Sequence, residues 1–478
     1  MFFAPFFDCG LECGASSFTR CPEVCRRDVT QSCQFGGTCV SVAPCKHWAR
    51  AAWRHGLDMS GFDTDGSMPS GFMLLIGAQF VSALADNALL ILTIAALDAL
   101  QFAPWWAPVL KWVFIAFYVV LAPFVGPLAD AVPKARLMAW MNLIKFLGAA
   151  LLLLGINPVL AYALVGLGAA AYAPAKYGLV TELVAPELLV RANAWIEVSV
   201  VSAALFGVVL GGVLVSAGLT QSVLATSLGQ GLPTAGTALA HLGLPLVLLL
   251  GLYILAGLLN LGVPRSTAVY PRSGSHPVAL CRAFWRDNRT LWRDRLGGLS
   301  LAVTALFWSV GACLQFLVLR WAQHALGLPL SQAAYLQAAI AVGVVIGACA
   351  ASRWVTLQGA RATLPMGLAL GLMMPLLALC HSVWLAVPVL VVAGALGGWM
   401  VVPLNALLQH RGAAVLTAGR SIAVQGFNEN SGVLLGLSLY AALVHLDVPA
   451  PSLLWGFGLA ISALLWLLMR WRPAAQAT

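Results

Sequence analysis

The sequence predicts an all-α polytopic membrane protein with twelve transmembrane helices in two six-helix halves, and three observations support this fold class. Of the 478 residues, 61% are hydrophobic and only 9% are charged, whereas about a quarter of the residues of a soluble domain are charged. Apolar runs of about 20 residues, long enough to cross a bilayer, recur along the chain. Two stretches of the first half have counterparts in the second half, which indicates an internal duplication.

Twelve apolar runs qualify as membrane spans, and Pro and Gly separate them, as in "GINP" at 155–158 and "LGVPR" at 261–265. We predict spans at residues 72–97, 108–130, 138–155, 159–177, 195–217, 242–263, 298–321, 333–352, 363–381, 384–406, 421–445 and 453–470.

The positions of Lys and Arg predict that both termini lie on the cytoplasmic side of the membrane. With the first helix entering from the cytoplasm, the outer loops 218–241 and 446–452 contain no Lys or Arg. Basic residues gather in cytoplasmic loops of membrane proteins, so the net charge of +9 reports orientation and predicts no nucleic-acid partner. The inner loops carry Lys134, Arg136, Arg191, Arg353, Arg361, Arg411 and Arg420, and the stretch 264–296 adds seven arginines.

The first 67 residues differ from the rest of the chain, because they hold seven of the eleven cysteines and no run of transmembrane length. Two Cys-x3-Cys pairs, Cys9/Cys13 and Cys21/Cys25, leave zinc binding open, although the spacings are loose for a zinc site. A basic leading region of a signal peptide is missing. We favour a disordered extension or a mis-assigned start, with translation beginning at Met59 or Met68, and predict no metal site.

The duplication sets the predicted domain boundaries. "PAKYGLVTELVAPELLVRANAW" from Pro174 matches "PLNALLQHRGAAVLTAGRSIAV" from Pro403, and "GPLADAVPKAR" from Gly126 matches the weaker "GACAASRWVTLQGAR" from Gly347 at a similar offset. Two parallel repeats about an axis along the membrane normal are typical of the major facilitator fold. We predict a Cys-rich non-membrane extension at 1–67, six-helix halves at 68–263 and 297–478, and a basic cytoplasmic loop at 264–296.

The Gly126–Arg136 stretch, G-x-x-A-D-x-x-x-K-x-R, resembles the loop motif that major facilitator proteins carry between their second and third helices. The resemblance implies that Gly126, Asp130 and Arg136 belong to a gate at the cytoplasmic helix ends. Charges that only set the topology are the alternative.

Six ionisable residues fall inside or close to the predicted spans. Charged groups are costly in the bilayer, so each either serves a function or pairs with another charge to hold two helices together. They are Asp86, Lys145, Lys176, Glu197, Arg320 and Glu429.

Two polar stripes favour a shared internal cavity. In the first span, Gln79, Ser82, Asp86 and Thr93 lie on one helix face, and Asn87 lies about 100° round from Asp86. In the eleventh span, a second stripe contains Gln425, Asn428, Glu429 and Gly432. Interhelical hydrogen bonding is the alternative.

Lys176 follows Pro174 near the end of the fourth span, where it could bind an anionic headgroup, pair with a carboxylate such as Glu197, or extend to the interface. Lys145 has no predicted role. Neither a P-loop nor the His-x4-Asp of glycerolipid acyltransferases occurs, so the sequence predicts no enzyme, no ATP-driven pump and no cofactor.

Residues 72–470 resemble the bacterial lysophospholipid transporters of the major facilitator superfamily. The resemblance rests on "AQFVSALADNALL", "LAPFVGPLAD", "GAAAYAPAKYG", "VRANAWIE", "GGWMVVPLNALLQHRG" and "AVQGFNENS", in the family's order. It implies flipping of lysophospholipids such as lysophosphatidylethanolamine from the outer to the inner leaflet. There a cytoplasmic acyltransferase/acyl-carrier-protein synthetase would reacylate them in phospholipid repair.

The resemblance also implies a substrate-binding or gating set of Asp86, Asn87, Lys176, Glu197 and Glu429, to which the polar stripes add Gln79 and Gln425. The seventh span departs from the family, because "CLQFLVLRW" has Gln315 at the position of the family's arginine and Arg320 five residues later. Five residues turn a helix by about 140° net, so Arg320 is not the same charge displaced.

Two alternatives to lysophospholipid flipping remain open. The first is a proton-coupled carrier of amphiphilic small molecules, with Asp86 as the protonation site. The second is a membrane scaffold for the acyltransferase, which needs no buried charge. The sequence does not identify the partner of Asp86, for which Lys176 and Arg320 are the candidates.

Overall fold

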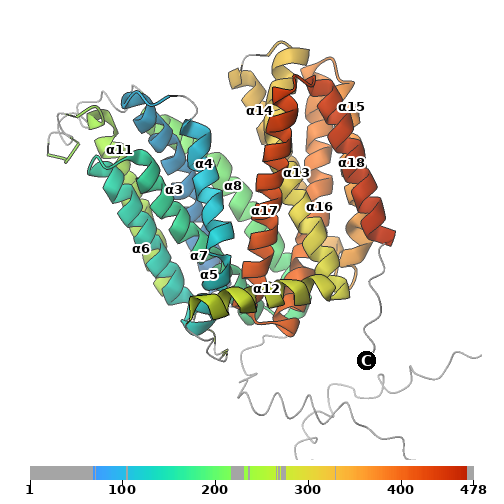
Figure 1. Ribbon diagram of the computed structural model, residues 1–478, viewed down its shortest axis with the longest axis horizontal. Coiled ribbons are helices and arrows are strands. Elements are labelled where there is room, and N and C mark those ends of the chain that lie inside the picture. The colour runs from blue at the N-terminus through green and yellow to red at the C-terminus, as the bar shows by residue number, and fades with distance from the viewer. Residues whose placement is uncertain are drawn as a thin grey trace, which may run out of the picture. The chain divides into compact units, whose positions relative to one another are not determined.

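The computed structural model describes residues 68–69, 71–103, 106–216, 231–234, 237–264, 266, 268, 270, 276–328 and 330–470 (Figure 1). They all belong to one compact unit, Asp58–Thr478. The predictions for residues 1–67, including the zinc alternative, lie outside the described residues.

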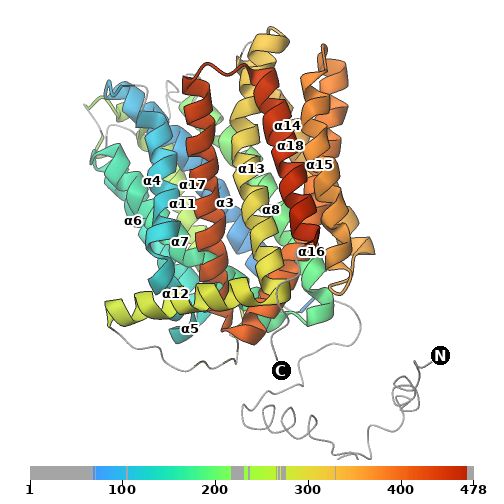
Figure 2. The same ribbon diagram turned by 45° about the vertical axis from the view of Figure 1, so that its right-hand side comes forward.

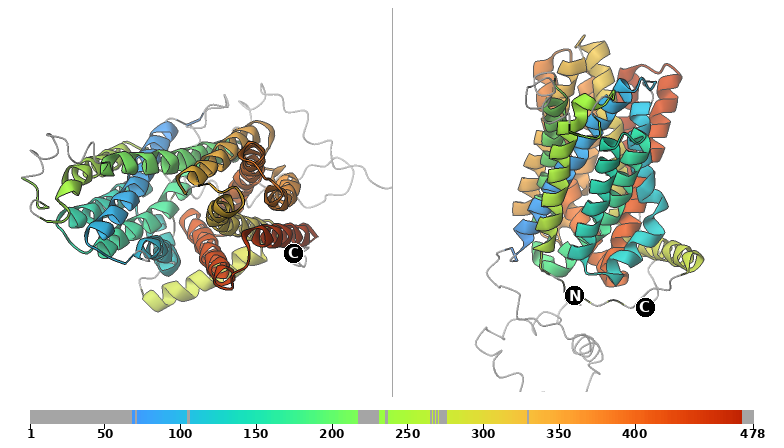
Figure 3. Two further views of the ribbon diagram at one scale, coloured as in Figure 1. Left: turned by 90° about the horizontal axis from the view of Figure 1, so that it is seen from above. Right: turned by 90° about the vertical axis from the view of Figure 1, so that its left-hand side faces the viewer.

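The described residues are helical and contain no strand, which confirms the all-α class. The first half comprises α3 (Phe72–Ala99), α4 (Trp106–Val120), α5 (Ala122–Ala131), α6 (Lys134–Leu153), α7 (Pro158–Leu183), α8 (Leu189–Val215) and α11 (Gly243–Leu261). The second half comprises α13 (Arg295–Ala325), α14 (Leu330–Trp354), α15 (Leu364–Ala378), α16 (Val383–Val415), α17 (Ala418–His445) and α18 (Ala450–Arg470). Viewed along the helices, the two sets form neighbouring groups (Figure 3).

Each of the twelve predicted spans falls on a long helix or on the α4–α5 pair. Among the described residues, ten helices are long and apolar enough to cross a membrane, and the bent pair raises the number to eleven. The twelfth, α17, is 28 residues long but is not among them. Its polar stripe, which contains Gln425, Asn428, Glu429 and Asn430, accounts for this difference.

The second predicted span is broken, because α4 and α5 meet at a bend of 62°. Pro123 stands in the first turn of α5, and Pro127 lies inside that helix. Proline removes a backbone donor and clashes with the preceding turn, so this sequence cannot continue α4 as a straight helix.

The central stretch 264–296, predicted as a loop, contains the additional helix α12 (Pro277–Arg293). It lies across the ends of the long helices and contacts α5, α13, α16 and α17 (Figure 2). The apolar residues Leu280, Phe284 and Leu291 recur at helical spacing between arginines, and this weak pattern is the signal that the loop prediction missed. We refer below to the α12 end and the opposite end of the helices.

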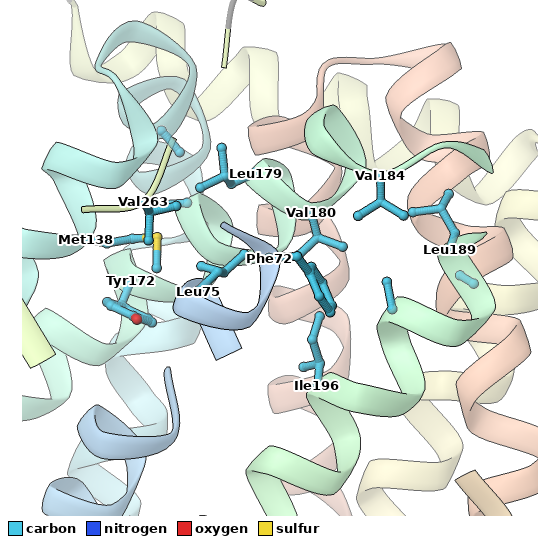
Figure 4. Packing of buried hydrophobic residues seen from close by; sticks show 14 of the residues in the cluster. Phe72, Leu75, Met138, Tyr172, Leu179, Val180, Val184, Leu189, Ile196 and Val263 are labelled. Carbon is cyan, nitrogen blue, oxygen red and sulfur yellow. The ribbon is translucent and has the colours of Figure 1, made fainter. Parts of the chain in front are cut away.

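A buried cluster joins the two halves near α7. It includes Phe72 of α3, Val180 of α7 and Ile196 of α8, which point toward one another (Figure 4). Residues of the second half, among them Ala351 and Val401, belong to the same cluster. Apolar packing therefore extends across the boundary between the halves.

Within the second half, α14 and α16 pack backbone against backbone. A Cβ added at Gly343 would lie 2.1 Å from the Val391 carbonyl oxygen, and one at Gly394 would lie 2.2 Å from that of Ile340. Small residues at i and i+4 permit this approach, which is a common way for helices to associate in membranes.

We expect Gly347→Ala to destabilise the protein by about 1–3 kcal/mol, the usual cost of overpacking. The added Cβ would lie 2.0 Å from the carbonyl oxygen of Ala395, and the backbone cannot easily move away. Thermal unfolding in detergent measures the effect. The control is Gly251→Ala, since nothing lies within 4 Å of a Cβ at that exposed helix position. Equal melting temperatures for the two variants would contradict this packing argument.

Candidate functional site

A cavity of about 290 Å³ lies between the halves. Its wall comes from α4 and α7 on one side and from α13, α16 and α17 on the other. Aromatic residues Tyr118, Tyr177 and Trp308 form part of this wall. The polar lining consists of Lys176, Asn405, Gln425, Glu429 and Asn430.

Lys176 is the cation of this polar cavity. Its Nζ donates to Oε1 of Gln79 at 3.2 Å and lies 4.1 Å from the centroid of the Tyr177 ring. Among the described residues, Lys176 forms no ion pair within 4.0 Å. The Nε2 of Gln79 is buried without a hydrogen-bond partner among the same residues. A buried ammonium without a counter-ion is costly, so Lys176 is suited to an anionic ligand.

Glu429 provides the opposite charge, from α17. Gln425 donates through Nε2 to Oε1 of Glu429 at 2.8 Å and to Oδ1 of Asn405 at 3.0 Å. The amide therefore joins α17 to α16 and fixes the orientation of the carboxylate. The prediction that the polar stripe of 421–445 faces a cavity is confirmed for Gln425 and Glu429.

A second cavity of about 390 Å³ is mainly apolar. Trp308 and Val433 line both cavities, so the two spaces adjoin. Glu197 also lines the apolar cavity, and its charge acts on Lys176 although the structure shows no ion pair between them. The remaining lining includes Phe307, Val310, Gly311, Leu314, Ile340, Val344, Leu370 and Gly397, with Lys111 and Gln315 hydrogen-bonded at its polar edge.

Asp86 lines neither cavity. Its Oδ2 lies 2.6 Å from Nζ of Lys145 on α6, and its Oδ1 accepts a hydrogen bond of 2.9 Å from the Tyr253 hydroxyl of α11. The Lys145 side chain is 2% exposed and the Asp86 side chain 14%. Neither candidate partner, Lys176 or Arg320, pairs with Asp86, and the residue that sequence reasoning left without a role is the partner.

The sequence contains a signal that could have identified Lys145 as the partner of Asp86, since α3 and α6 each carry two polar residues one turn apart. Ser82 and Asp86 lie one turn apart on α3, and Asn142 and Lys145 lie one turn apart on α6. Ser82 donates to Oδ1 of Asn142 at 2.7 Å and accepts from Lys145 at 3.0 Å. The stripe on α3 faces the interior as predicted, but most of it is used to join helices of the first half.

Two further predicted site residues lie elsewhere. Asn87 donates to the carbonyl oxygen of Ala83 in its own helix, and its Cβ lies against Gly207 of α8. Arg320 of α13 hydrogen-bonds to Tyr440 of α17, within the second half. The structure brings neither of them to Asp86 or to the polar cavity.

The predicted gate motif does contact the other half, at the α12 end. Thr417 donates its hydroxyl to Oδ2 of Asp130, and the Gly419 N–H donates to Oδ1 at 2.9 Å. A Cβ on Gly126 would lie 2.9 Å from Cα of Arg420, so this close approach requires glycine.

Lys134, and not Arg136, is the basic residue of this contact. Its Nζ lies 3.8 Å from Asp130 and 2.6 Å from Glu182 of α7. Arg136 is exposed and forms no ion pair within 4.0 Å among the described residues. The resemblance places Arg136 in the gate, but α6 turns its side chain outward, so its role there stays a prediction.

More polar contacts join elements at the α12 end. Asn193 of α8 and Gln409 of α16 exchange two hydrogen bonds of 2.9 Å across the halves. Asp294 caps α13 and pairs with Arg411 at 2.9 Å. Burial would raise the pKa of the Asp294 carboxyl, but the Arg411 guanidinium and the Gly297 N–H outweigh it and hold the pKa below its usual value. The α12 end is thus closed by contacts between the halves.

The described residues contain no group of three or more His, Cys, Asp or Glu arranged to hold a metal ion. The chemistry of the site is therefore that of one cation, one carboxylate, side-chain amides and aromatic rings beside an apolar space.

Long apolar helices around adjoining polar and apolar cavities, closed at one end, define a membrane transporter. The family model of the Major Facilitator Superfamily matches residues 75–414. Two solved structures share the fold, each at 16% identity and over 84% of this chain. One is a bacterial homologue of the iron transporter ferroportin in an outward-facing state (TM-score 0.62, 98% of that chain), and the other is the transporter FucP in the outward conformation (TM-score 0.61, 97%).

The curated relatives are more similar. Lysophospholipid transporter LplT of Salmonella arizonae is 41% identical over 405 residues, covering 84% of this chain and 96% of the relative. Its counterpart in Yersinia enterocolitica is 41% identical over 380 residues, covering 79% and 88%. The chain therefore belongs to the major facilitator superfamily and, within it, to the family that these LplT proteins represent.

We expect Lys145→Met to destabilise the protein by about 3–5 kcal/mol, because it leaves the Asp86 carboxylate buried without its counter-ion. The double variant Asp86→Asn/Lys145→Met removes both charges and should recover most of the loss. Thermal unfolding of the wild type, both single variants and the double variant completes the cycle. Additive losses would contradict a direct interaction between the two side chains.

Proposed function

We propose that the protein transports lysophospholipids, such as lysophosphatidylethanolamine, from the outer to the inner leaflet of the bacterial inner membrane. The observation that carries this proposal is the pair of adjoining cavities, one polar with Lys176 and Glu429 and one apolar, which meet at Trp308 and Val433. A lysolipid has the same two parts, a charged headgroup and one acyl chain. The names of the LplT relatives support this substrate class.

The polar cavity suits a zwitterionic headgroup. Lys176 would bind the phosphate, since an ammonium that lacks a carboxylate partner gains most from an anion. Glu429, oriented by Gln425, would accept hydrogen bonds from the headgroup ammonium. Tyr177, whose ring already lies against the Lys176 ammonium, would help to keep that cation in place.

The apolar cavity suits the acyl chain. Its walls come mainly from α13, α14 and α16, and Gly311 of α13, with nothing within 4 Å of a Cβ placed there, leaves room for a ligand. A volume of about 390 Å³ is within the usual range of ligand pockets, roughly 300–1,000 Å³. Burial of a hydrocarbon chain there would provide affinity, while the polar cavity would provide orientation.

The Asp86–Lys145 pair has a different role in this proposal. With Tyr253 and Ser82 it connects α3, α6 and α11, all in the first half. Alternating access requires each half to move as a body about the substrate site. We assign the pair to the rigidity of the first half and not to contact with the headgroup.

The proposed orientation places the α12 end in the cytoplasm, together with both termini. Lys134, Arg136, Arg353 and Arg361 lie at helix ends on that side, as do the arginines of α12, whereas Lys111 and Arg320 belong to the opposite ends of α4 and α13. The contacts at Asp130 and Asn193 would then close the cavity toward the cytoplasm, and substrate would enter from the outer side.

Flipping would deliver lysolipid to a cytoplasmic acyltransferase/acyl-carrier-protein synthetase, and the two activities together would repair phospholipids. In this proposal the acyl transfer belongs to that partner and the transporter itself is not an enzyme.

A second candidate, a proton-coupled carrier of amphiphilic small molecules, is favoured by one observation. Glu197 and Glu429 lie inside the bundle, and neither forms an ion pair within 4.0 Å among the described residues. Carboxylates in such positions serve as proton carriers in many transporters.

Reconstituted protein should move fluorescent lysophosphatidylethanolamine across proteoliposome membranes, and Lys176→Met should slow this movement about ten- to hundredfold. The factor corresponds to the loss of a charge-assisted hydrogen bond of about 1.5–3 kcal/mol. Lys176→Arg keeps the charge and should retain more activity. Absence of lipid movement, with uptake of small amphiphilic cations that depends on a proton gradient, would favour the second candidate.

Acyl-chain length should distinguish the two cavities. Gly311 lines the apolar cavity, and nothing lies within 4 Å of a Cβ placed there, so Gly311→Phe should fill the space without unfolding the helix. We expect severalfold slower transport of long-chain lysolipids and little change for short-chain ones, measured in the same proteoliposomes. Gly251→Phe, at an equally open helix position outside both cavities, is the control. Equal effects at all chain lengths would contradict this assignment.

A further inference from the structure

Helix α12 has one side packed on the bundle. Phe284 and Leu291 are buried, at 5% and 0% exposure, in a cluster with Ala122 of α5 and Val424 of α17. Phe284 and Trp285 pack edge-on against the Phe427 ring. Because α5 belongs to the first half and α17 to the second, this side of α12 covers the boundary between the halves.

Polar contacts fix the same side. Asp287 pairs with Arg420 of α17 at 2.5 Å, and Asn288 accepts from Asn428 at 2.9 Å. Trp292 donates its indole N–H to Oδ1 of Asn428 at 3.0 Å. The position and rotation of α12 are therefore defined, and so is the side that it turns away from the bundle.

Two parallel stripes are exposed on α12. One faces directly away from the bundle, and the other lies at the edge of the packed side, where Trp285 and Trp292 also contact α17. The first stripe consists of four arginines at i, i+4, i+7 and i+11, namely Arg282, Arg286, Arg289 and Arg293. All four are exposed, and none forms an ion pair within 4.0 Å among the described residues. Val278, Trp285 and Trp292 recur every seven residues in the adjacent stripe, and they are 54%, 57% and 36% exposed. At 100° per residue the two stripes are about 70° apart around the helix.

In the part of the chain that the structure describes, no carboxylate forms an ion pair with the arginine stripe. The two acidic residues of this segment, Asp287 and Asp294, are held by Arg420 and Arg411 of the bundle. Arg286 lies near enough to Asp287 for their charges to interact, but that carboxylate is already paired with Arg420. The stripe thus presents an excess of positive charge beside exposed tryptophans.

The helix lies across the ends of the spanning helices (Figure 2). The headgroups of a leaflet begin where such apolar helices end. Tryptophan is enriched at that level, and basic residues there are attracted to anionic lipid. We propose that the Arg282–Arg293 stripe and the Trp285/Trp292 stripe bind the anionic phospholipid headgroups of the leaflet on the α12 side, and that this binding stabilises the closed boundary between α5 and α17.

Lipid binding and closure of the boundary between the halves are linked because they involve opposite sides of the same helix, α12. The side that packs on α5 and α17 can keep these contacts only while the halves are together at this end, whereas the other side faces the leaflet. Anionic lipid therefore binds α12 better in the closed arrangement than in the open one. A ligand with such a difference in affinity shifts the equilibrium toward the state it binds better, here the closed arrangement.

The test uses the full chain in nanodiscs of phosphatidylethanolamine, with or without phosphatidylglycerol. Hydrogen–deuterium exchange of 277–293 and of the first turns of α17 reports the state of the boundary. Phosphatidylglycerol should slow this exchange about tenfold in the wild type. In Arg286→Gln/Arg289→Gln the slowing should disappear, and native mass spectrometry should show roughly 25-fold less retained phosphatidylglycerol, since each arginine near an anionic surface adds about a fivefold factor.

Two further variants keep the result interpretable. Arg353→Gln/Arg361→Gln removes the same charge from exposed positions outside α12 and should respond to phosphatidylglycerol like the wild type. Arg286→Lys/Arg289→Lys retains the charge and should retain most of the effect, which separates lipid attraction from a folding defect. The proposal would be overturned if Arg353→Gln/Arg361→Gln lost the response to phosphatidylglycerol as fully as Arg286→Gln/Arg289→Gln. Equal exchange rates with and without phosphatidylglycerol in the wild type would also overturn it. The measurement uses no lysolipid and is independent of the transport function.

Discussion

An ionised side chain inside a bilayer must be paired, hydrogen-bonded or hydrated, and the arrangement of this protein follows from that constraint. Asp86 and Lys145 satisfy each other at 2.6 Å, with Tyr253 and Ser82 completing their hydrogen bonds. This polar cluster determines how α3, α6 and α11 face one another. Lys176 and Glu429, which form no ion pair within 4.0 Å among the described residues, line the polar cavity between the halves, and Glu197, likewise without an ion pair, lines the adjoining one. Pairing thus separates charges that hold the structure from charges available to a ligand.

The contacts within a half differ in kind from those between halves. In the second half, α14 and α16 approach so closely at their glycines that a single methyl group would clash with the backbone. Between the halves, the α12 end is joined by hydrogen bonds at Asp130, Asn193 and Gln409, by the close approach of Gly126 to Arg420, and by an apolar cluster. Close backbone packing makes each half rigid, and hydrogen bonds at helix ends can exchange for water. This difference is what rocking of one half against the other requires.

The sequence predicted the fold well because its signals are local. Apolar length located the twelve predicted spans, each of which falls on a long helix or on the α4–α5 pair. The spacing of the polar residues in 421–445 predicted which side of α17 faces the cavity, including Gln425 and Glu429. Helix α12 was missed because the apolar residues at Leu280, Phe284 and Leu291 are diluted by arginines. The broken span at Leu121 was missed for a different reason, since Pro123 and Pro127 can start or bend a helix as well as end one.

By itself, then, the sequence determined the fold class, the interior-facing side of α3 and of α17, and the residue types available to a site, because helical periodicity is a property of each segment. Only the tertiary structure decided which charges meet. Lys145, and not Lys176 or Arg320, pairs with Asp86, and Lys134, not Arg136, contacts Asp130. Such pairings depend on the rotation and depth of one helix relative to another. Packing across the whole bundle sets both, and no single helix encodes them.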